Sequence, residues 1–331
     1  MNYIGSKLKL SSFLKDTVIK TVGNIDDKIF CDIFAGTGIV GRTFKPLVKS
    51  VISNDIEYYS YVLNKNYIGN YSVLDYAHLI EELNNLELIE GFVYKHYSVE
   101  GHGERQYFSD YNAKKIDTIR TRIEVWKDKK IINDNMYYFL LASLIESADK
   151  VANTASVYGA YLKKLKKSAL KDLVLVPATF DTIGNNHSVY NSDSNHIIKS
   201  ISGDILYMDP PYNQRQYGSN YHLLNTIAKY DDFEPKGKTG LREYNRSSYC
   251  KKNDVAKAFE ELIEHADFKY IFLSYNNEGL MSASDVKEIM KRYGDYSLET
   301  TEYQRFKADK TESRNHKATS TIEYLHILIK P

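Results

Sequence analysis

The chain has 331 residues, with 44 Lys or Arg against 43 Asp or Glu and 43% hydrophobic residues, which excludes a disordered or fibrous protein and predicts one or two globular domains. Its two cysteines, Cys31 and Cys250, show no metal-site spacing, so we expect neither a disulfide framework nor a metal centre, and a cytoplasmic location. The longest strongly apolar run, residues 136–145, is about half of a bilayer span, and we expect no membrane partner.

Two short apolar runs near the N-terminus, residues 28–34 and 50–54, are typical of buried strands. A glycine turn and enough residues for a helix separate them, which predicts a βαβ unit in a parallel sheet covered by helices. Farther along, residues 112–126 and 135–147 show the spacing of apolar side chains that is typical of helices. Further strands are expected at residues 204–208, 270–275 and 324–330.

The alternation of strands and helices is thus interrupted and then resumes. This pattern predicts an α/β domain made of residues 1–71 and 186–331, with a mainly helical insertion at residues 72–185.

The segment DIFAGTGIVG, residues 32–41, follows the first predicted strand and contains the pattern GxGxxG. Its glycines, including Gly36 and Gly38, let the backbone approach a ligand, either a pyrophosphate or the methionyl part of S-adenosylmethionine. Asp55 lies at the end of the next strand, where a carboxylate can accept hydrogen bonds from both ribose hydroxyls. These features predict an adenosine-containing cofactor and leave open which one.

The tetrapeptide Asp209-Pro210-Pro211-Tyr212 directly follows the strand predicted at residues 204–208. Two prolines fix the backbone and remove two N–H donors, so the Pro210 carbonyl is left beside the Asp209 carboxylate. These two acceptors and the Tyr212 ring suit a planar ring that bears an exocyclic amino group. The alternative is that the prolines only turn the chain out of the sheet.

The order of cofactor loop, long insertion and DPPY tetrapeptide resembles the Dam-type family of DNA adenine-N6 methyltransferases, especially the modification enzymes of type II restriction systems. The resemblance runs nearly end to end. It implies a Rossmann-like fold that binds S-adenosylmethionine, with helices on both faces of the sheet and the insertion as a target-recognition region. The implied catalytic residues are Asp209, Pro210, Pro211 and Tyr212, and the implied cofactor-binding residues are Tyr3, Lys7, Asp32, Phe34, Gly36, Gly38, Asp55 and Asp193.

The matching residues lie in five places, which include the DPPY tetrapeptide and Asp55, the match to the family's ribose-binding acid. Tyr3 and Lys7 match the family's aromatic-x-Gly-x-Lys segment, and Asp32 and Phe34 match its cofactor loop. Asp193 lies in the segment that precedes the tetrapeptide, where the family has an acid that meets the cofactor adenine.

The expected partner is double-stranded DNA. Hydrogen bonds from the adenine N6–H groups to Asp209 and the Pro210 carbonyl would stabilise the positive charge that develops on N6 during methyl transfer. A duplex base reaches such a pocket only when it swings out of the stack. A restriction endonuclease that acts on the same site, without a stable complex, is a further expected partner.

Positive charge gathers in the insertion, where residues 101–175 hold 14 Lys or Arg against 9 Asp or Glu, an excess of five. Asn153 and Arg105 are candidate base readers in this region. The candidate phosphate contacts are Lys163, Lys164, Lys166 and Lys167, together with Arg314 and Lys317 in the polar stretch 307–320. A solvated helix face and an ordinary hairpin loop are the alternatives for these two stretches.

Three other functions remain open from the residues alone. The first is methylation of an amino group in RNA or of a protein glutamine. The second is a nicotinamide-dependent oxidoreductase that uses GTGIVG, which leaves DPPY unexplained. The third is a nucleic-acid-binding module without catalytic activity, against which the intact tetrapeptide argues.

Overall fold

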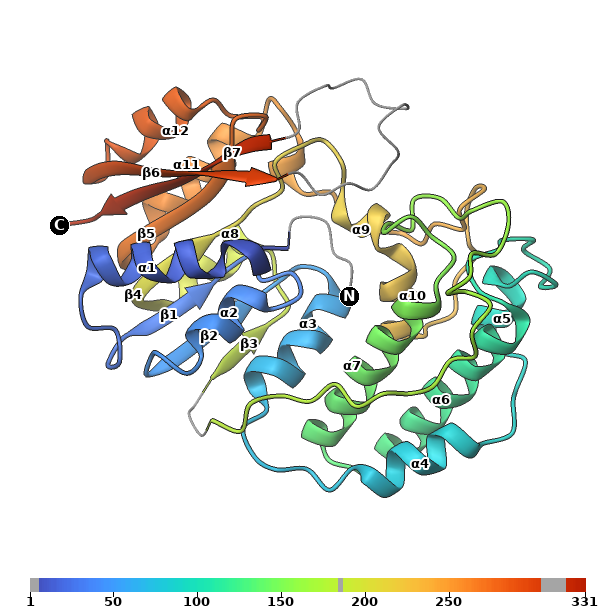
Figure 1. Cartoon of the computed structure of the whole chain (residues 1–331). Helices are drawn as coiled ribbons and strands as arrows, with labels where there is room; N and C mark the ends of the chain where they lie inside the picture. Colours follow the sequence, from blue (N-terminus) through green and yellow to red (C-terminus); the bar gives the residue numbers. More distant parts are fainter. Residues whose placement is uncertain (1–5, 184–186, 305–319) are drawn as a thin grey trace. The chain divides into compact units, whose positions relative to one another are not determined.

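The computed structural model describes residues 6–183, 187–304 and 320–331, so Tyr3, Arg314 and Lys317 lie outside the described residues. The chain forms two compact units (Figure 1). The sheet unit comprises the described residues of Gly5–Asn64, Ile183–Gln216 and Asn245–Pro331, and the helical unit comprises Lys65–Thr182 and Tyr217–Tyr244.

The sheet unit is built on seven strands in the order β3-β2-β1-β4-β5-β7-β6. The first five of these run parallel, and β7 pairs antiparallel with both β5 and β6. Each strand range predicted from the sequence overlaps an observed strand, whereas no range was predicted for β3 or β6. The strands are β1 (Ile29–Asp32), β2 (Ser50–Asn54), β3 (Ser188–Tyr190), β4 (Ser202–Met208), β5 (Asp267–Asn276), β6 (Asp295–Gln304) and β7 (Ser320–Ile329).

Helices cover both faces of this sheet (Figure 1). On one face Phe259 and Val286 pack with Met208 and Leu273 in a single apolar core. On the other face β1 packs against α2, whose Phe44 stacks on Phe30 with ring centroids 4.1 Å apart. The helices are α1 (Ser11–Val22), α2 (Ile39–Phe44), α3 (Tyr58–Asn64), α8 (Ser194–Ile197), α11 (Val255–His265) and α12 (Ala283–Met290). The predicted Rossmann-like α/β fold is confirmed.

The helical unit contains both helices that were predicted from apolar spacing, now seen as α6 (Asp110–Asp128) and α7 (Asp134–Val151). Its extent differs from the predicted insertion because Tyr217–Tyr244 clusters with it, through contacts of α10 with α7. Among the described residues, no helix has the length and apolar character needed to cross a membrane. The remaining helices are α4 (Ala77–Asn85), α5 (Phe92–Tyr97), α9 (Tyr217–Asn220) and α10 (His222–Lys229).

Candidate active site

The carboxyl ends of the parallel strands and the start of β7 bring four polar side chains to one edge of the sheet. Asp32 ends β1 and Asp209 follows β4, and these strands are neighbours. Ser274 lies near the end of β5. Because β7 runs antiparallel to β5, its early residue Glu323 pairs with Asn276 at the same edge. These residues therefore meet at the edge where open α/β sheets bind their ligands.

Lys7, which directly precedes the first helical turn, contacts two of these side chains and also Tyr212. Its Nζ lies 3.1 Å from Oδ1 of Asp209 and 2.9 Å from Oε1 of Glu323, and it donates a hydrogen bond to the Tyr212 hydroxyl. The side chains of Lys7 and Glu323 are 5% and 4% exposed, whereas that of Asp209 is 18% exposed. Of Lys7, Glu323 and Asp209, the most accessible side chain is thus that of Asp209. We refer to Lys7, Asp209, Tyr212, Ser274 and Glu323 as the Lys7 cluster.

Tyr212 is held by its hydroxyl, its ring and its backbone. The hydroxyl donates to Oδ1 of Asp209 over 2.5 Å, and the ring meets Tyr275 edge-on with centroids 5.1 Å apart. The Tyr212 carbonyl accepts a hydrogen bond from the Leu280 N–H. Pro210 and Pro211 separate Asp209 from Tyr212 in the sequence. Pro210 is buried and Pro211 is half-buried. The tetrapeptide is therefore an anchored loop, which is more than a turn out of the sheet requires.

The charged side chains of the Lys7 cluster shift the pKa values of Asp209 and Lys7. Burial raises the pKa of Asp209 and the neighbouring Glu323 carboxylate raises it further, while the Lys7 ammonium opposes both. For Lys7, burial lowers the pKa but the charges of Asp209 and Glu323 outweigh it, so the pKa is raised and the ammonium stays charged. Two carboxylates share one buried cation.

The predicted cofactor loop is organised by Asp55. One carboxylate oxygen accepts a hydrogen bond from the Gly36 N–H and the other accepts one from the Glu57 N–H, each over 2.8 Å. Burial raises the pKa of Asp55 to about 6, although both backbone hydrogen bonds oppose this. Asp55 therefore joins the end of β2 to the glycine loop, in addition to the ribose contact predicted for it.

Both the backbone conformation at position 38 and the nearby Asn64 side chain favour glycine there. The φ of Gly38 is +77°, and a Cβ at this position would lie 2.6 Å from Oδ1 of Asn64. Asn64 also donates to the Gly36 carbonyl over 3.0 Å and accepts from the Ser53 hydroxyl over 2.8 Å. Asn64, on α3, was not among the predicted residues because nothing in its local sequence marks it.

Asp32 carries a buried oxygen that is free to meet a ligand. Its Oδ2 accepts from the Gly41 N–H over 3.2 Å, whereas Oδ1 has no hydrogen-bond partner within the described residues. Burial, and then the nearby Asp209 charge, raises the pKa of Asp32 well above its usual range. A buried acceptor beside other carboxylates suits a cationic or N–H-donating ligand group.

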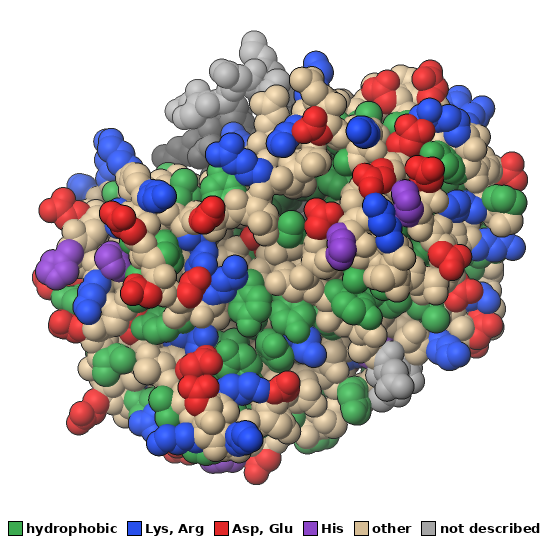
Figure 2. Space-filling view, turned by 180° about the vertical axis from the view of Figure 1, so that it is seen from behind, with side chains coloured by type: hydrophobic (Ala, Val, Ile, Leu, Met, Phe, Trp, Pro, Cys, Tyr) green, Lys and Arg blue, Asp and Glu red, His purple; other side chains and the backbone are tan. Residues whose placement is uncertain are grey.

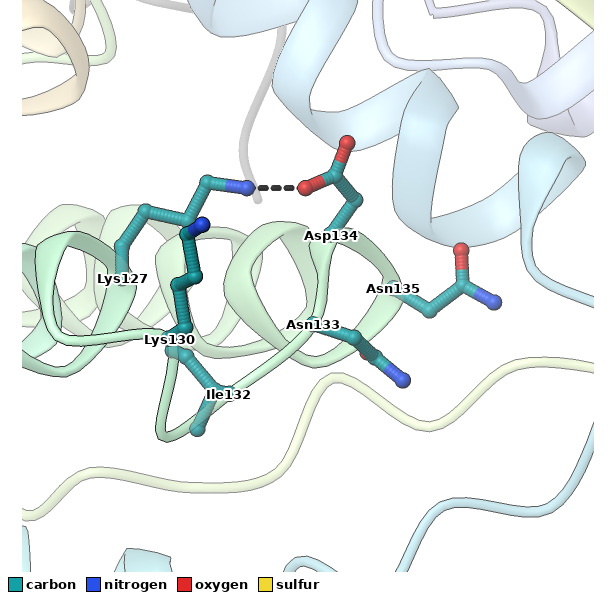
Figure 3. Close-up of a pocket in the computed structure, with 6 residues that line it drawn as sticks. All are labelled: Lys127, Lys130, Ile132, Asn133, Asp134 and Asn135. Atoms are coloured by element: carbon teal, nitrogen blue, oxygen red, sulfur yellow. Dashed lines mark hydrogen bonds and ion pairs between the residues drawn. The ribbon is translucent and has the colours of Figure 1, made fainter.

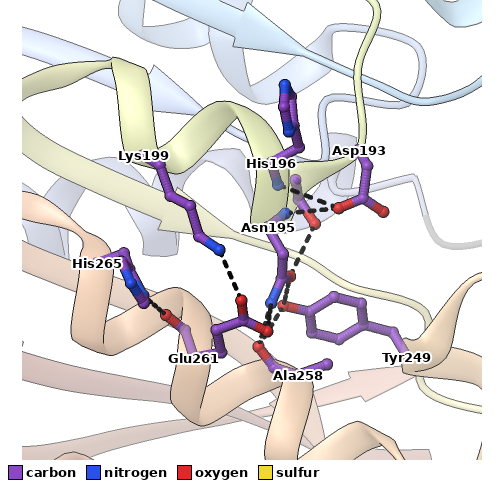
Figure 4. Close-up of polar contacts among 9 residues, drawn as sticks. Asp193, Asn195, His196, Lys199, Tyr249, Ala258, Glu261 and His265 are labelled. Carbon is purple, nitrogen blue, oxygen red and sulfur yellow. Dashed lines mark hydrogen bonds and ion pairs between the residues drawn. The ribbon is translucent and has the colours of Figure 1, made fainter.

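Asp193, another predicted cofactor residue, lies at the start of α8 (Figure 4). Asp193 caps this helix by accepting from the backbone N–H groups of Asn195 and His196. Asn195 in turn accepts from the Tyr249 hydroxyl over 2.8 Å, and the Tyr249 ring meets Phe34 edge-on with centroids 5.0 Å apart. Through these contacts α8 is joined to the glycine loop, while the predicted contact of Asp193 with the cofactor adenine stays a prediction.

The candidate phosphate-binding lysines differ in their surroundings. Lys163, Lys164 and Lys167 are exposed and lie in a loop, not on the helix that was the alternative. Lys166 is half-buried, and its Nζ donates to the Thr154 carbonyl over 2.7 Å. Lys166 therefore supports the loop.

The two candidate base readers have structural roles. Asn153 is fully buried and donates to the carbonyls of Gln106 and Leu162. Arg105 donates to the carbonyls of His96 and Gly237, which holds two loops of the helical unit together. The prediction that Asn153 reads a base was wrong, because its buried amide already satisfies backbone groups. Base reading by the half-buried Arg105 stays a prediction.

The helical unit also has an open pocket of about 590 Å³ at the turn from α6 to α7 (Figure 3). Its polar lining includes Lys127, which pairs with Asp134 across it. The pocket contains none of the predicted site residues.

Comparison with known proteins decides the family. A family model for D12 class N6 adenine-specific DNA methyltransferases matches residues 3–320. The chain belongs to this family. Membership in the D12 class confirms the resemblance to Dam-type adenine methyltransferases and rules out the nicotinamide-dependent oxidoreductase.

Several curated proteins resemble this D12 class methyltransferase. Type II methyltransferase M.NlaIII of Neisseria lactamica is 65% identical over 100% of this chain and 99% of its own length. M.CviAII of Paramecium bursaria Chlorella virus 1 is 39% identical over 93% of each. M.FokI of Planomicrobium okeanokoites is 42% identical over 100% of this chain and 53% of its own length. Among solved structures, TehB from Haemophilus influenzae aligns over 96% of this chain and 61% of its own, with a TM-score of 0.37 and 8% identity.

Proposed function

We propose that this D12 class methyltransferase transfers a methyl group from S-adenosylmethionine to N6 of adenine within a specific sequence of double-stranded DNA. We further propose that it is the modification enzyme of a restriction system, as the names of its relatives suggest. The observation that carries the proposal is the anchored tetrapeptide, in which an accessible Asp209 is held by Lys7 and Tyr212 at the ligand-binding edge of the sheet.

The residues of the sheet unit suit the cofactor. Bound S-adenosylmethionine supplies a methyl group on a positively charged sulfur. The free buried oxygen of Asp32 and the excess of carboxylates in the Lys7 cluster favour a ligand that carries positive charge. The Gly36–Gly38 loop allows close backbone approach, and Asp55 supplies carboxylate oxygens at the end of β2.

Asp209 is suited to act on the target amino group. Within the described residues, its contacts with Lys7 and Tyr212 are both made by Oδ1, which leaves Oδ2 for an adenine N6–H. The Pro210 carbonyl is the second proposed acceptor. Hydrogen bonds from N6 to these oxygens stabilise the charge that develops on the nitrogen, and the methylated nitrogen then loses its proton to water. The half-buried Tyr212 ring offers a face against which a flipped base can lie.

We assign target recognition to the helical unit, with Lys163, Lys164 and Lys167 as phosphate contacts. These three side chains are exposed and clustered in sequence. On the face of the molecule in Figure 2, basic and acidic side chains are interspersed. The proposed DNA contact therefore rests on this local group of lysines.

A pool of duplexes with randomised sequence tests this proposal. The protein is incubated with the pool and S-adenosylmethionine, and methylated adenines are then located by sequencing. We expect N6-methyladenine in one short sequence context. Methylation at adenines without a shared context would contradict site specificity. Methyl transfer only to RNA or to a protein glutamine, offered in parallel, would contradict the DNA substrate.

A further inference from the structure

Glu323 lies outside residues 3–320, which the family model matches, yet Tyr212 of the tetrapeptide contacts it. We infer that Glu323 is a positioning residue for methyl transfer, because it restrains Lys7 and Tyr212 so that one oxygen of Asp209 stays free for the target amino group. The inference rests on the proposed function of Asp209.

A single oxygen of Glu323 is approached by two donors and by the Tyr212 hydroxyl, whose one proton it shares with Asp209. Oε1 of Glu323 lies 2.9 Å from Lys7 Nζ, 2.7 Å from the Ser274 hydroxyl and 3.1 Å from the Tyr212 hydroxyl. The side chain is 4% exposed, so it is nearly closed to water. The Ser274 contact fixes Glu323 to β5, the strand beside β4, from whose end the tetrapeptide extends. A carboxylate so placed acts on its neighbours and not on the substrate.

The geometry of Lys7 shows what this restraint achieves. An ammonium beside a lone buried carboxylate is free to bind both of its oxygens. Here the pull of Glu323 keeps Lys7 on the Oδ1 side of Asp209, and Tyr212 is bound to that same oxygen. Without Glu323, Lys7 would compete with the target amino group for Oδ2.

The charge of Glu323 also acts on Asp209. The charged and titratable groups that face Asp209 are Lys7 before α1, Glu323 on β7, Tyr212 in its own loop, Tyr207 on β4 and Asp32 on β1. Among them Glu323 raises the pKa of Asp209 and Lys7 lowers it. Removal of the Glu323 charge should therefore lower the pKa of Asp209, and removal of the Lys7 charge should raise it.

The test compares the pH dependence of kcat for wild-type protein, Glu323→Gln and Lys7→Met at saturating duplex and cofactor. For Glu323→Gln we expect kcat to fall by about tenfold or more, with cofactor affinity within about threefold. Activity requires ionised Asp209 and is lost as pH falls. We therefore expect the acidic limb to move to lower pH in Glu323→Gln and to higher pH in Lys7→Met. The double variant should lose no more activity than Lys7→Met alone, since Glu323 acts largely through Lys7.

Glu302→Gln makes the same chemical change at an exposed position on the neighbouring strand β6, and it should keep wild-type kcat and pH profile. If Glu323→Gln keeps the wild-type kcat and the acidic limb of its pH profile does not move, the inference is overturned but the proposed function is not. A wild-type enzyme that methylates no DNA would overturn both the inference and the proposed function. If Glu323→Gln does not fold, Glu323→Asp is used instead, because it keeps the charge but moves the carboxylate away from Lys7 and Tyr212. A lowered kcat in Glu323→Asp would support the inference, and a wild-type kcat would overturn it.

Discussion

Lys7 and Glu323 lie 316 positions apart in the sequence and form a buried ion pair with Nζ and Oε1 2.9 Å apart. This pair joins the segment before α1 to the start of β7, and both reach the tetrapeptide that follows β4. The tetrapeptide is therefore supported by two segments that are distant from it in the sequence. Breaking either half of the pair leaves the other charge buried with fewer partners, which is a costly state.

The first prediction concerns Asp55 and its raised pKa. Because burial raises this pKa to about 6, the carboxylate is ionised above that pH and becomes protonated below it. Cofactor affinity should therefore weaken as pH falls through about 6 in the wild-type protein, and calorimetry across this range measures it. Asp55→Ala should weaken cofactor binding by about 1–3 kcal/mol at neutral pH.

Asp55→Asn serves as the matched variant, because it keeps the shape of the side chain and removes its titration. Its cofactor affinity should show much less change across pH 6 than that of the wild-type protein. Unchanged affinity in Asp55→Ala would show that another acid holds the ribose.

The second prediction separates two reasons for Gly38. Gly38→Ala should lower the free energy of unfolding by more than backbone strain alone, because the new Cβ meets Asn64 at 2.6 Å. Gly237→Ala is the control, since Gly237 also has a positive φ, +68°, but nothing lies within 4 Å of its Cβ position. We expect about 1–2 kcal/mol of destabilisation for Gly237→Ala and about 1–3 kcal/mol more for Gly38→Ala.

Chemical denaturation measures both values, and cofactor titration adds a second comparison. Only Gly38→Ala should weaken cofactor binding. Equal destabilisation of the two variants would mean that the Asn64 side chain moves away from the new Cβ at little cost and does not restrict the loop.

The third prediction contrasts lysines that are adjacent in sequence. Alanine at Lys163, Lys164 and Lys167 should weaken binding to all duplexes similarly and reduce the slope of log affinity against log salt by about one for each phosphate that is no longer neutralised. Lys166→Ala should leave this slope nearly unchanged and instead lower the free energy of unfolding by about 1 kcal/mol, because the Thr154 carbonyl loses its donor. An unchanged salt slope in the triple variant would place the phosphate contacts elsewhere.

The parts of the site that follow a strand directly could be predicted from the sequence. A carboxylate at a strand end reaches the ligand-binding edge whatever the rest of the chain does, and Asp32, Asp55 and Asp209 are all of this kind. The helices α6 and α7 were predictable for a similar reason, since their apolar spacing is a local property.

Glu323 could not be predicted in this way. In the sequence it is a charged residue between Ile322 and Tyr324, which is typical of the solvent-facing side of a strand. Its burial depends on the antiparallel register that pairs it with Asn276, and register is set by contacts distant in sequence. The place of Tyr217–Tyr244 in the helical unit was hidden for the same reason, because the packing of α10 on α7 leaves no local mark.

The most direct test of the proposed chemistry follows the methyl group itself. The protein is incubated with duplex DNA and S-adenosylmethionine whose methyl carries an isotopic label, and the hydrolysed nucleosides are identified by mass spectrometry. Wild-type protein and Asp295→Ala, an exposed acid at the start of β6, should label N6 of deoxyadenosine, and Asp209→Ala should give no label while it binds cofactor within a few-fold of wild type. Label on cytosine, or labelled adenine formed by Asp209→Ala at the wild-type rate, would contradict the role assigned to Asp209.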